Sequence, residues 1–279
     1  MRSLGIDVGV AKGLDLVLLD ERRVPLVVKT HVGPGEVGAL LDELQPDVVA
    51  IDSPPRWAKT GRSRLTERQL ATCNIQSFNT PSEAHGRGNA FFRWMEVGFE
   101  VFRVANEHGF PTYGAGNPKG KAMEVFPHGS AVVLAGSLPP KGTSKRVWRE
   151  HVLRAQGVRT DELTSIDRID AALAAFTGLL ALDGKRFAPG DPTDGVIVLP
   201  VSSLPAKPYR AAARPLPEGA PLFNYCACGD PACQELVRAE FAPGHDAKRK
   251  ATLWRRVREG QDAIDELEER GWKLPPEMP

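Results

Sequence analysis

The chain has 279 residues, 42% of them hydrophobic, which is enough to bury one large core and leaves room for a small second module. Its formal net charge of +1 at pH 7 excludes a uniformly basic chain, so any nucleic-acid surface must come from local clusters of charge. The first residues enter a strand pattern without an apolar signal-peptide core, and no uncharged stretch is long enough to span a bilayer. We therefore expect a cytoplasmic protein that contacts no membrane.

The first fifty residues predict the beginning of an α/β domain. Short apolar runs at 3–9, 14–20 and 24–32 are separated by turns and predict an antiparallel meander of three strands. A helical pattern at 35–44 precedes the nearly all-apolar run 48–51, which is typical of a strand buried on both faces. This order predicts a mixed sheet in which the fourth strand is added in parallel through a right-handed helical crossover.

The rest of the chain predicts further helices and strands, and then a second module. A loop-rich segment, 56–93, overlaps the start of the next helix, and six prolines between positions 200 and 221 indicate a semi-rigid linker. The expected domains are 1–202, a proline-rich linker 203–222 and a small module 223–279. The expected helices span 91–108, 143–153 and 165–182, and the expected strands 121–129 and 195–200.

Acidic residues end the two central strands of the predicted sheet. Asp7 precedes a glycine turn and Asp52 precedes two prolines, so both are expected at the edge of the sheet where ligands bind in α/β proteins. Glu124 is bracketed by apolar residues on another expected strand. Asp167 and Asp170 share one face of an alanine-rich helix, where like charges repel unless a cation lies between them.

Carboxylate oxygens are the ligands that Mg²⁺ or Mn²⁺ prefers, and paired ions of this kind serve phosphoryl transfer with an activated water. The five acids are thus candidate catalytic residues. Each also has a structural explanation: Asp7 and Asp52 could form Asx-turns, Glu124 could face water, and Asp167 could cap its helix.

Four short segments, GIDVG, VAIDSP, EVFP and IDRIDAALAAF, occur in an order that resembles the domain of unknown function 429 family. Its members are regarded as predicted nucleases of the RNase H-like fold. The resemblance implies an RNase H-like mixed sheet flanked by helices, with metal-binding acids at Asp7, Asp52, Glu124 and Asp170. Asp167 and Asp170, three positions apart on the last helix, also resemble the acid pair of Holliday-junction resolvases. This resemblance implies that Asp167 is an auxiliary ligand.

Two other functions stay open beside a divalent-metal-dependent nuclease. The segment GIDVGVAKG, with Asp7, Gly9 and Lys12, resembles the first phosphate loop of actin-like sugar kinases, which implies an ATPase or a small-molecule kinase. A non-catalytic nucleic-acid-binding protein is the second alternative. His128 departs from the small residues that usually follow the EVFP-like segment of the family, and it is either an added proton carrier or a helix start.

Two basic clusters are candidates for contact with DNA or RNA. Segment 56–93 contains seven basic residues against two acidic ones, and segment 246–260 contains six against two. Phosphate contacts of this type weaken steeply with salt, whereas a solvated helix face is the structural alternative for the second cluster. The residues singled out are Arg62, Arg64, Arg68, Lys248, Arg249 and Arg255.

The C-terminal module has the composition of a small zinc site. Cys226, Cys228, Cys233 and His245 form a C-x-C-x4-C-x11-H series, and tetrahedral Zn²⁺ accepts three thiolates and one imidazole. Four cysteines in the whole chain are too few for a disulfide framework in the cytoplasm. His245 could instead cap the basic helix that follows it. The sequence leaves a homodimer open.

Overall fold

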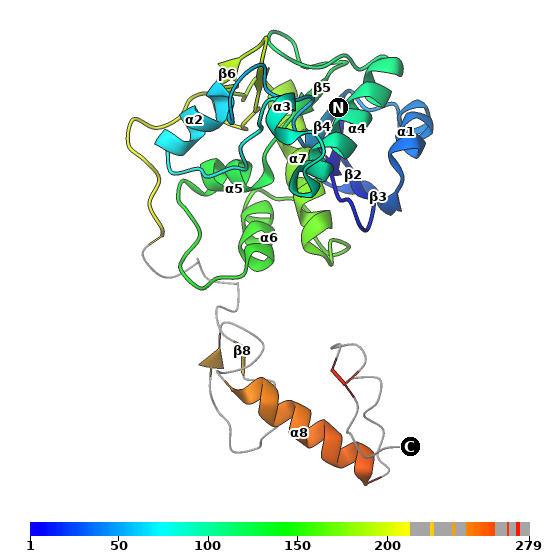
Figure 1. Cartoon of the computed structure of the whole chain (residues 1–279), viewed down its shortest axis with the longest axis vertical. Coiled ribbons are helices and arrows are strands. Elements are labelled where there is room, and N and C mark those ends of the chain that lie inside the picture. The colour runs from blue at the N-terminus through cyan, green and yellow to red at the C-terminus, as the bar shows by residue number, and fades with distance from the viewer. Residues whose placement is uncertain (213–223, 226–235, 238–243, 260–266, 268–271, 274–279) are drawn as a thin grey trace. The chain divides into compact units, whose positions relative to one another are not determined.

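The computed structural model describes residues 1–212, 224–225, 236–237, 244–259, 267 and 272–273 (Figure 1). The chain divides into two compact units. The first comprises Met1–Pro139 and Lys145–Ala212, and the second comprises Pro140–Ser144 and Ala213–Pro279. In the described part of the chain, no helix combines the length and the apolar character needed to cross a bilayer.

A five-stranded mixed sheet forms the centre of the first unit, with strand order β3-β2-β1-β4-β5. The first three strands are antiparallel, and β4 and β5 are added in parallel. The α/β class, the N-terminal meander and the parallel fourth strand were all predicted and are confirmed. The strands are β1 (Arg2–Asp7), β2 (Leu14–Asp20), β3 (Pro25–Val32), β4 (Val48–Asp52) and β5 (Ala122–Glu124).

Helices cover both faces of this sheet. Alternate strand residues point to opposite faces, so Leu4 and Ile6 of β1 enter a core with α1 (Val37–Leu44) and α4 (Arg93–Glu107). On the opposite face of the sheet, Val48 and Ala50 of β4 pack against α7, and α5 and α6 pack against α7 in turn. The elements of this side are α5 (Pro127–Ala135), α6 (Lys145–Ala155) and α7 (Ile166–Leu182), and a short 3₁₀ turn, η1 (Pro34–Glu36), precedes α1.

Small residues let α7 lie directly on β1. A Cβ added to Gly5 would come within 1.9 Å of the carbonyl oxygen of Ala171, and one added to Gly178 would come within 2.1 Å of Ser3 Oγ. No side chain larger than hydrogen fits at either crossing without movement of the backbone or of Ser3. The alanine-rich composition of α7 therefore places its first turn beside the carboxyl end of β1.

Three elements differ from the sequence prediction. Segment 56–93 is not only loop, because it forms α2 (Leu65–Thr72), α3 (Glu83–Gly86) and η2 (Ala90–Phe92). The expected strand 121–129 ends at Glu124, since Pro127 provides the preorganised first residue of α5.

The apolar run 195–200 also pairs less than expected. It forms the two-residue hairpin of β6 (Gly190–Asp191) with β7 (Gly195–Val196), and Val198 makes an isolated bridge to Val125. Burial of 196–199 in the core explains its apolar character better than strand pairing does.

The first unit extends to Ala212, past the predicted boundary at 202. Backbone bonds hold this extension: Leu138 N–H donates to the Arg210 carbonyl at 2.9 Å, and Ala212 N–H donates to the Leu138 carbonyl at 3.2 Å. The beginning of the expected linker is thus part of the first unit.

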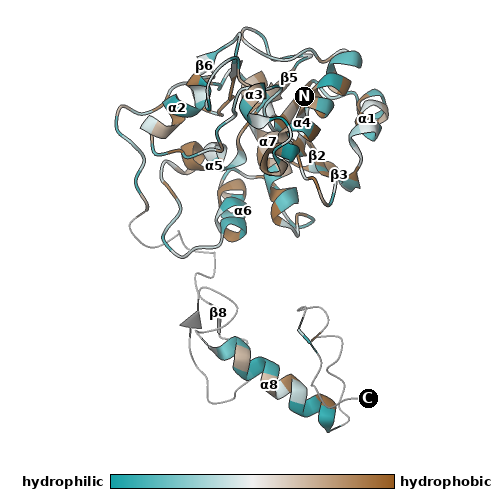
Figure 2. Ribbon diagram, viewed as in Figure 1, coloured by the Kyte–Doolittle hydropathy of each residue, from teal (hydrophilic) through white to brown (hydrophobic). Residues whose placement is uncertain are grey.

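The described part of the second unit contains a basic helix over a small apolar cluster. It comprises the hairpin β8 (Asn224–Tyr225) with β9 (Leu236–Val237), and α8 (His245–Arg258), which Figure 2 shows as largely hydrophilic. Leu253, Val257 and Leu267 are buried together, and Trp254 and Trp272 pack against them.

Candidate functional site

Asp7 and Asp52 lie side by side at the edge of the sheet. Strands β1 and β4 run in parallel, and their register makes Asp7 the direct partner of Asp52. Neighbouring strands are about 4.8 Å apart, so the two acids end adjacent strands at one level. The predicted convergence of these two residues is observed.

The first turn of α7 brings two more aspartates to this edge. Ser165 is the N-cap of the helix, and its side chain accepts a hydrogen bond from Arg168 N–H at 3.1 Å. Capping therefore requires neither Asp167 nor Asp170. Asp170 is only 8% exposed, whereas Asp167 faces Lys12 of the β1–β2 turn at 3.9 Å.

The pKa of Asp7 reflects burial and the neighbouring acids. Burial raises the pKa of Asp7 to about 9, and the repulsion of neighbouring carboxylates contributes to the rise. The contributing residues, in decreasing order, are Asp52, Asp170, Asp167 and Asp15. Acidic residues from β1, β2, β4 and α7 thus form one cluster of carboxyl groups.

Asp52 and Asp170 carry the same signature. Burial raises the pKa of Asp52 well above its ordinary value, and the charge of Asp170 adds to the rise. Burial also raises the pKa of Asp170 to about 6, although Arg149 opposes this shift. Each of these carboxylates is therefore in an environment that penalises its ionised form unless a cation is added.

Arg149 is the basic residue that the sequence analysis missed at this site. It lies on α6, and its Nη1 donates to Asp170 Oδ2, while Asp170 Oδ1 and Arg149 Nε are buried without a hydrogen-bond partner among the described residues. The sequence did contain a signal for it: Arg149 is a basic residue on the buried face of α6, together with Trp148 and Val152. One guanidinium does not balance Asp7, Asp52 and Asp170.

Glu124 is neutralised in a different way. Arg64 donates from Nη1 and Nη2 to the two carboxylate oxygens of Glu124 at 2.7 and 2.6 Å, and from Nε to Glu67 at 3.0 Å. Glu67 also accepts a hydrogen bond from Thr80 N–H at 2.9 Å. This network links α2 to the end of β5.

The position of Arg64 corrects one prediction. Arg64 is 1% exposed, so it does not belong to an exposed basic surface as expected; its charge is used to pair buried acids. Arg62 and Arg68 are exposed, and Arg68 Nη1 donates to the Ser63 carbonyl at 2.7 Å.

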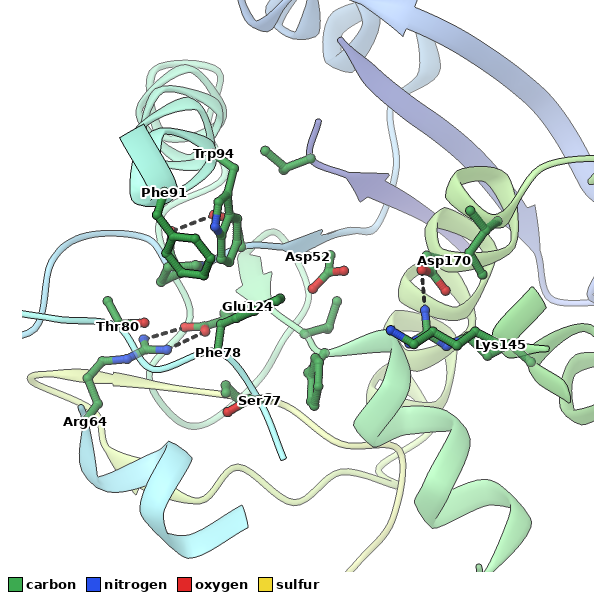
Figure 3. A pocket seen from close by; sticks show the side chains of 18 residues that line it. Asp52, Arg64, Ser77, Phe78, Thr80, Phe91, Trp94, Glu124, Lys145 and Asp170 are labelled. Carbon is green, nitrogen blue, oxygen red and sulfur yellow. Dashed lines mark hydrogen bonds and ion pairs between the residues drawn. The ribbon is translucent and has the colours of Figure 1, made fainter. Parts of the chain in front are cut away.

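A cavity of about 580 Å³ opens beside the acids (Figure 3). In Figure 3, Asp52 lies between Asp170 with Lys145 on one side and Phe91 with Trp94 on the other. A second hollow of about 390 Å³ is lined by Asp7, Asp15 and Asp167. Val8 lines both, so the carboxylate cluster lies where the two hollows adjoin.

His128 is the second residue of α5, which supports its interpretation as part of a helix start. Its ring contacts Phe126 and Trp148, with centroids 5.8 and 5.7 Å apart. Burial lowers the pKa of His128 to about 4, so the ring is neutral near pH 7.

The predicted residues of the second unit are only partly described. Lys248 and Arg255 are exposed on α8, Arg249 is half-buried, and His245 is the first residue of that helix. Cys226, Cys228 and Cys233 lie outside the described residues. The zinc site stays a prediction.

The carboxylate cluster fits a divalent cation in its chemistry. It offers hard oxygen donors, including Asp170 Oδ1, which has no hydrogen-bond partner in the described part of the chain. In their present positions, however, no three His, Cys, Asp or Glu side chains among the described residues are arranged so that they could hold a metal ion together.

Comparisons with known proteins place the chain in a family. No curated protein sequence matches it. A solved structure described as "Thermus thermophilus RuvC structure" is similar, with a TM-score of 0.36 and 16% identity, over 66% of this chain and 97% of that chain. At that TM-score the likeness supports no conclusion about this chain. A family model described as "Protein of unknown function (DUF429)" matches residues 5–194, which is more than half of the chain, and the protein therefore belongs to the DUF429 family.

Proposed function

We propose that the first unit is a divalent-metal-dependent nuclease that hydrolyses phosphodiester bonds, with Mg²⁺ or Mn²⁺ held by Asp7, Asp52 and Asp170. The observation that carries this proposal is the register pairing of Asp7 with Asp52 next to the buried Asp170. Converging buried acids lower the free energy of unfolding unless a cation balances them. A ligand set explains their presence better than a structural role does.

The proposal gives each acid of the cluster a role. Asp7 and Asp52 offer carboxylate oxygens from the sheet edge, and Asp170 offers Oδ1 while Arg149 holds its other oxygen. Asp167 and the Arg64-bound Glu124 tune the cluster through their charges. When bound, divalent ions stabilise the charge on the phosphate and lower the pKa of a bound water. Since the described carboxylates do not yet enclose an ion, we propose that they rotate toward it on binding.

Basic side chains of the first unit suit a phosphate backbone. Lys145 lines the 580 Å³ cavity, and Arg62 and Arg68 are exposed on the segment that precedes and forms α2. In the second unit, Lys248, Arg249 and Arg255 of α8 are proposed to add contacts to DNA or RNA, which salt would weaken.

The actin-like alternative has less support. An ATPase or kinase of that kind needs two subdomains around its nucleotide, and the described residues contain a single five-stranded sheet. A non-catalytic nucleic-acid-binding protein would not need buried acids that repel one another.

A cleavage assay tests the proposal. The full chain is incubated with Mn²⁺ or with EDTA and a panel of branched, RNA–DNA hybrid and single-stranded substrates, and ATP hydrolysis is followed in parallel. We expect Mn²⁺-dependent cleavage, which Asp7→Asn and Asp52→Asn each reduce at least about 100-fold. Asp161→Asn, at a side chain that is 78% exposed, is the matched control and should cleave normally.

The other outcomes of this assay contradict the proposal in different ways. Hydrolysis of ATP without cleavage would support the actin-like alternative. Salt-sensitive binding with neither activity would support a non-catalytic protein. Cleavage that survives both aspartate substitutions would show that the acids do not form the site.

The zinc prediction has an independent test. We propose that Cys226, Cys228, Cys233 and His245 bind one Zn²⁺. Elemental analysis of the purified full chain should give about one zinc per chain, and Cys226→Ser should lower this content. An unchanged metal content would contradict the assignment without affecting the carboxylate site.

A further inference from the structure

Four aromatic side chains line the cavity beside the carboxylate cluster, and three of them, Phe78, Phe91 and Trp94, form a group. Phe78 is 62% exposed and Phe91 is 57% exposed. The ring of Phe78 contacts the rings of both Phe91 and Trp94. The ring centroids of Phe78 are 5.7 Å from Phe91 and 5.9 Å from Trp94. All three side chains line the cavity that also contains Asp52 and Asp170.

Exposure of such rings needs an explanation. Burial of a large apolar side chain is favourable, so contiguous exposed aromatic side chains are uncommon. Where they occur, they often mark a binding surface. Helical backbone carries two of the rings. Trp94 belongs to α4, and Phe91 belongs to η2, whose N-cap Asn89 accepts a hydrogen bond from Phe91 N–H at 3.0 Å. The positions from which these two rings project are therefore set by the fold.

The cavity wall also carries polar and charged groups among its apolar residues. Ser77 Oγ lines it and has no hydrogen-bond partner among the described residues, although buried hydroxyls are normally satisfied. Lys145 and the acids Asp52 and Asp170 lie across from Phe91 and Trp94 (Figure 3). A ligand that fits combines a flat apolar ring, hydrogen-bonding groups on its rim and an attached anion. A nucleotide has these properties.

We propose that this cavity binds an unstacked nucleobase of a single-stranded nucleic acid against Phe78, Phe91 and Trp94, with the adjoining phosphate beside Lys145 and the carboxylate cluster. The volume of about 580 Å³ lies within the range of small-molecule sites. A base inside a duplex is covered on both faces by its neighbours, so it does not present a face to a protein ring. The inference rests on the proposed nuclease function and assigns its substrate class: single strands, or unpaired nucleotides within a duplex.

Binding measured without cleavage tests this inference. Fluorescence anisotropy of a labelled 12-nucleotide oligothymidylate and of a blunt duplex of the same length is followed with the full chain in EDTA. We expect the single strand to bind more tightly. Loss of one stacking ring weakens nucleic-acid binding by about tenfold, so Phe78→Ala and Phe91→Ala should each show that loss for the single strand alone.

The controls separate stacking from folding. Leu26→Ala shortens a side chain that is 50% exposed on β3, which does not line the cavity, and should leave binding unchanged. Phe91→Trp keeps a stacking face and should retain binding. The oligothymidylate should also quench tryptophan fluorescence, and Trp94→Phe should remove this quenching.

The two proposals fail in different ways. Asp7→Asn should abolish cleavage but keep single-strand binding in EDTA. Single-strand binding that depends on Phe78 and Phe91 without any cleavage would overturn the nuclease proposal alone. Cleavage with equal binding of single strand and duplex, or with no effect of the two phenylalanine substitutions, would overturn the base-binding site alone.

Discussion

Two sets of acids near the carboxyl ends of β1, β4 and β5 have different electrostatic environments. Glu67 and Glu124 are joined through Arg64, whose guanidinium donates to both carboxylates. At the ends of β1 and β4, Asp7 and Asp52 stand next to each other, and Arg149 reaches Asp170 instead. The first set is balanced by a cation within the protein, whereas the second has more carboxyl groups than the protein has cations to pair with them.

This difference separates a structural role from a functional one. An acid at a strand end is a similar sequence signal in β1, β4 and β5. Only the cation that reaches it decides whether the acid stabilises the fold or remains able to bind an external ion. Arg64 fills that place for Glu124, and we infer that a divalent ion fills it for Asp7 and Asp52.

Removal of Arg64 should have the largest effect on stability. Arg64→Met leaves Glu67 and Glu124 buried without their cation, and breaking a buried pair in this way costs about 3 to 5 kcal/mol. Urea denaturation measures the free energy of unfolding. Arg68→Met, at an exposed arginine of the same segment, is the control and should change it by less than about 0.5 kcal/mol. Equal effects of the two substitutions would show that the buried network of Arg64 adds no more to the free energy of unfolding than an exposed arginine does.

Addition of a divalent ion should act on the other set of acids. A ligand that binds only the folded state at 100 times its Kd raises the free energy of unfolding by about 2.7 kcal/mol. We therefore expect Mg²⁺ or Mn²⁺ to raise the Tm of the wild-type chain, and to do so much less in Asp7→Asn. A shift of the same size in Asp7→Asn would place the stabilising ion elsewhere.

The contact between α7 and β1 should be the next most sensitive feature. Gly5→Ala adds a methyl group 1.9 Å from the Ala171 carbonyl oxygen, so the helix must move away from the strand. Overpacking of this kind costs about 1 to 3 kcal/mol and would also displace Asp170 from Asp7. Gly35→Ala, where no atom lies within 4 Å of the added carbon, is the matched control in denaturation and cleavage assays.

The smallest effect on the free energy of unfolding should come from removal of a single carboxyl group, and it should stabilise the protein. Asp7→Asn removes a carboxyl group that the folded protein keeps protonated at pH 8, and in EDTA at that pH it should raise the free energy of unfolding by about 1 kcal/mol or more. Glu124→Gln should lower it, because Arg64 then loses part of its pairing. Destabilisation by both substitutions would contradict the contrast between the two sets.

The raised pKa of Asp7 also makes the free energy of unfolding depend on pH. Burial raises the pKa of Asp7 from 3.8 in the unfolded chain to about 9 in the folded protein. Between these values the folded state holds a proton that the unfolded state has lost, so stability falls as pH rises from about 4 to 9. Below pH 4 both states are protonated and this contribution is fully present. Denaturation curves in EDTA should show the fall, and Asp7→Asn should reduce its slope.

Local patterns determined much of the fold and part of the site. Alternating and continuous apolar runs define the meander and β4, because strand pairing and burial follow directly from them. The strand-breaking residues after Asp7 and Asp52 place both acids at an edge. Small residues in 165–182 predict a tightly packed helix, which brings Asp170 to the same place. These features depend on short-range spacing, so they can be read before folding.

Long-range pairing decided the rest. Arg64 and Glu124 are 60 positions apart, and Arg149 and Asp170 are 21 apart, so no local pattern shows which acid receives which cation. The exposure of Phe78 and Phe91 is likewise set by what the folded chain leaves uncovered. The sequence alone determined which acids reach the sheet edge, because strand ends are local. Only the tertiary structure decided which of them are neutralised, since electrostatic balance in a buried site depends on every charge that the fold brings near.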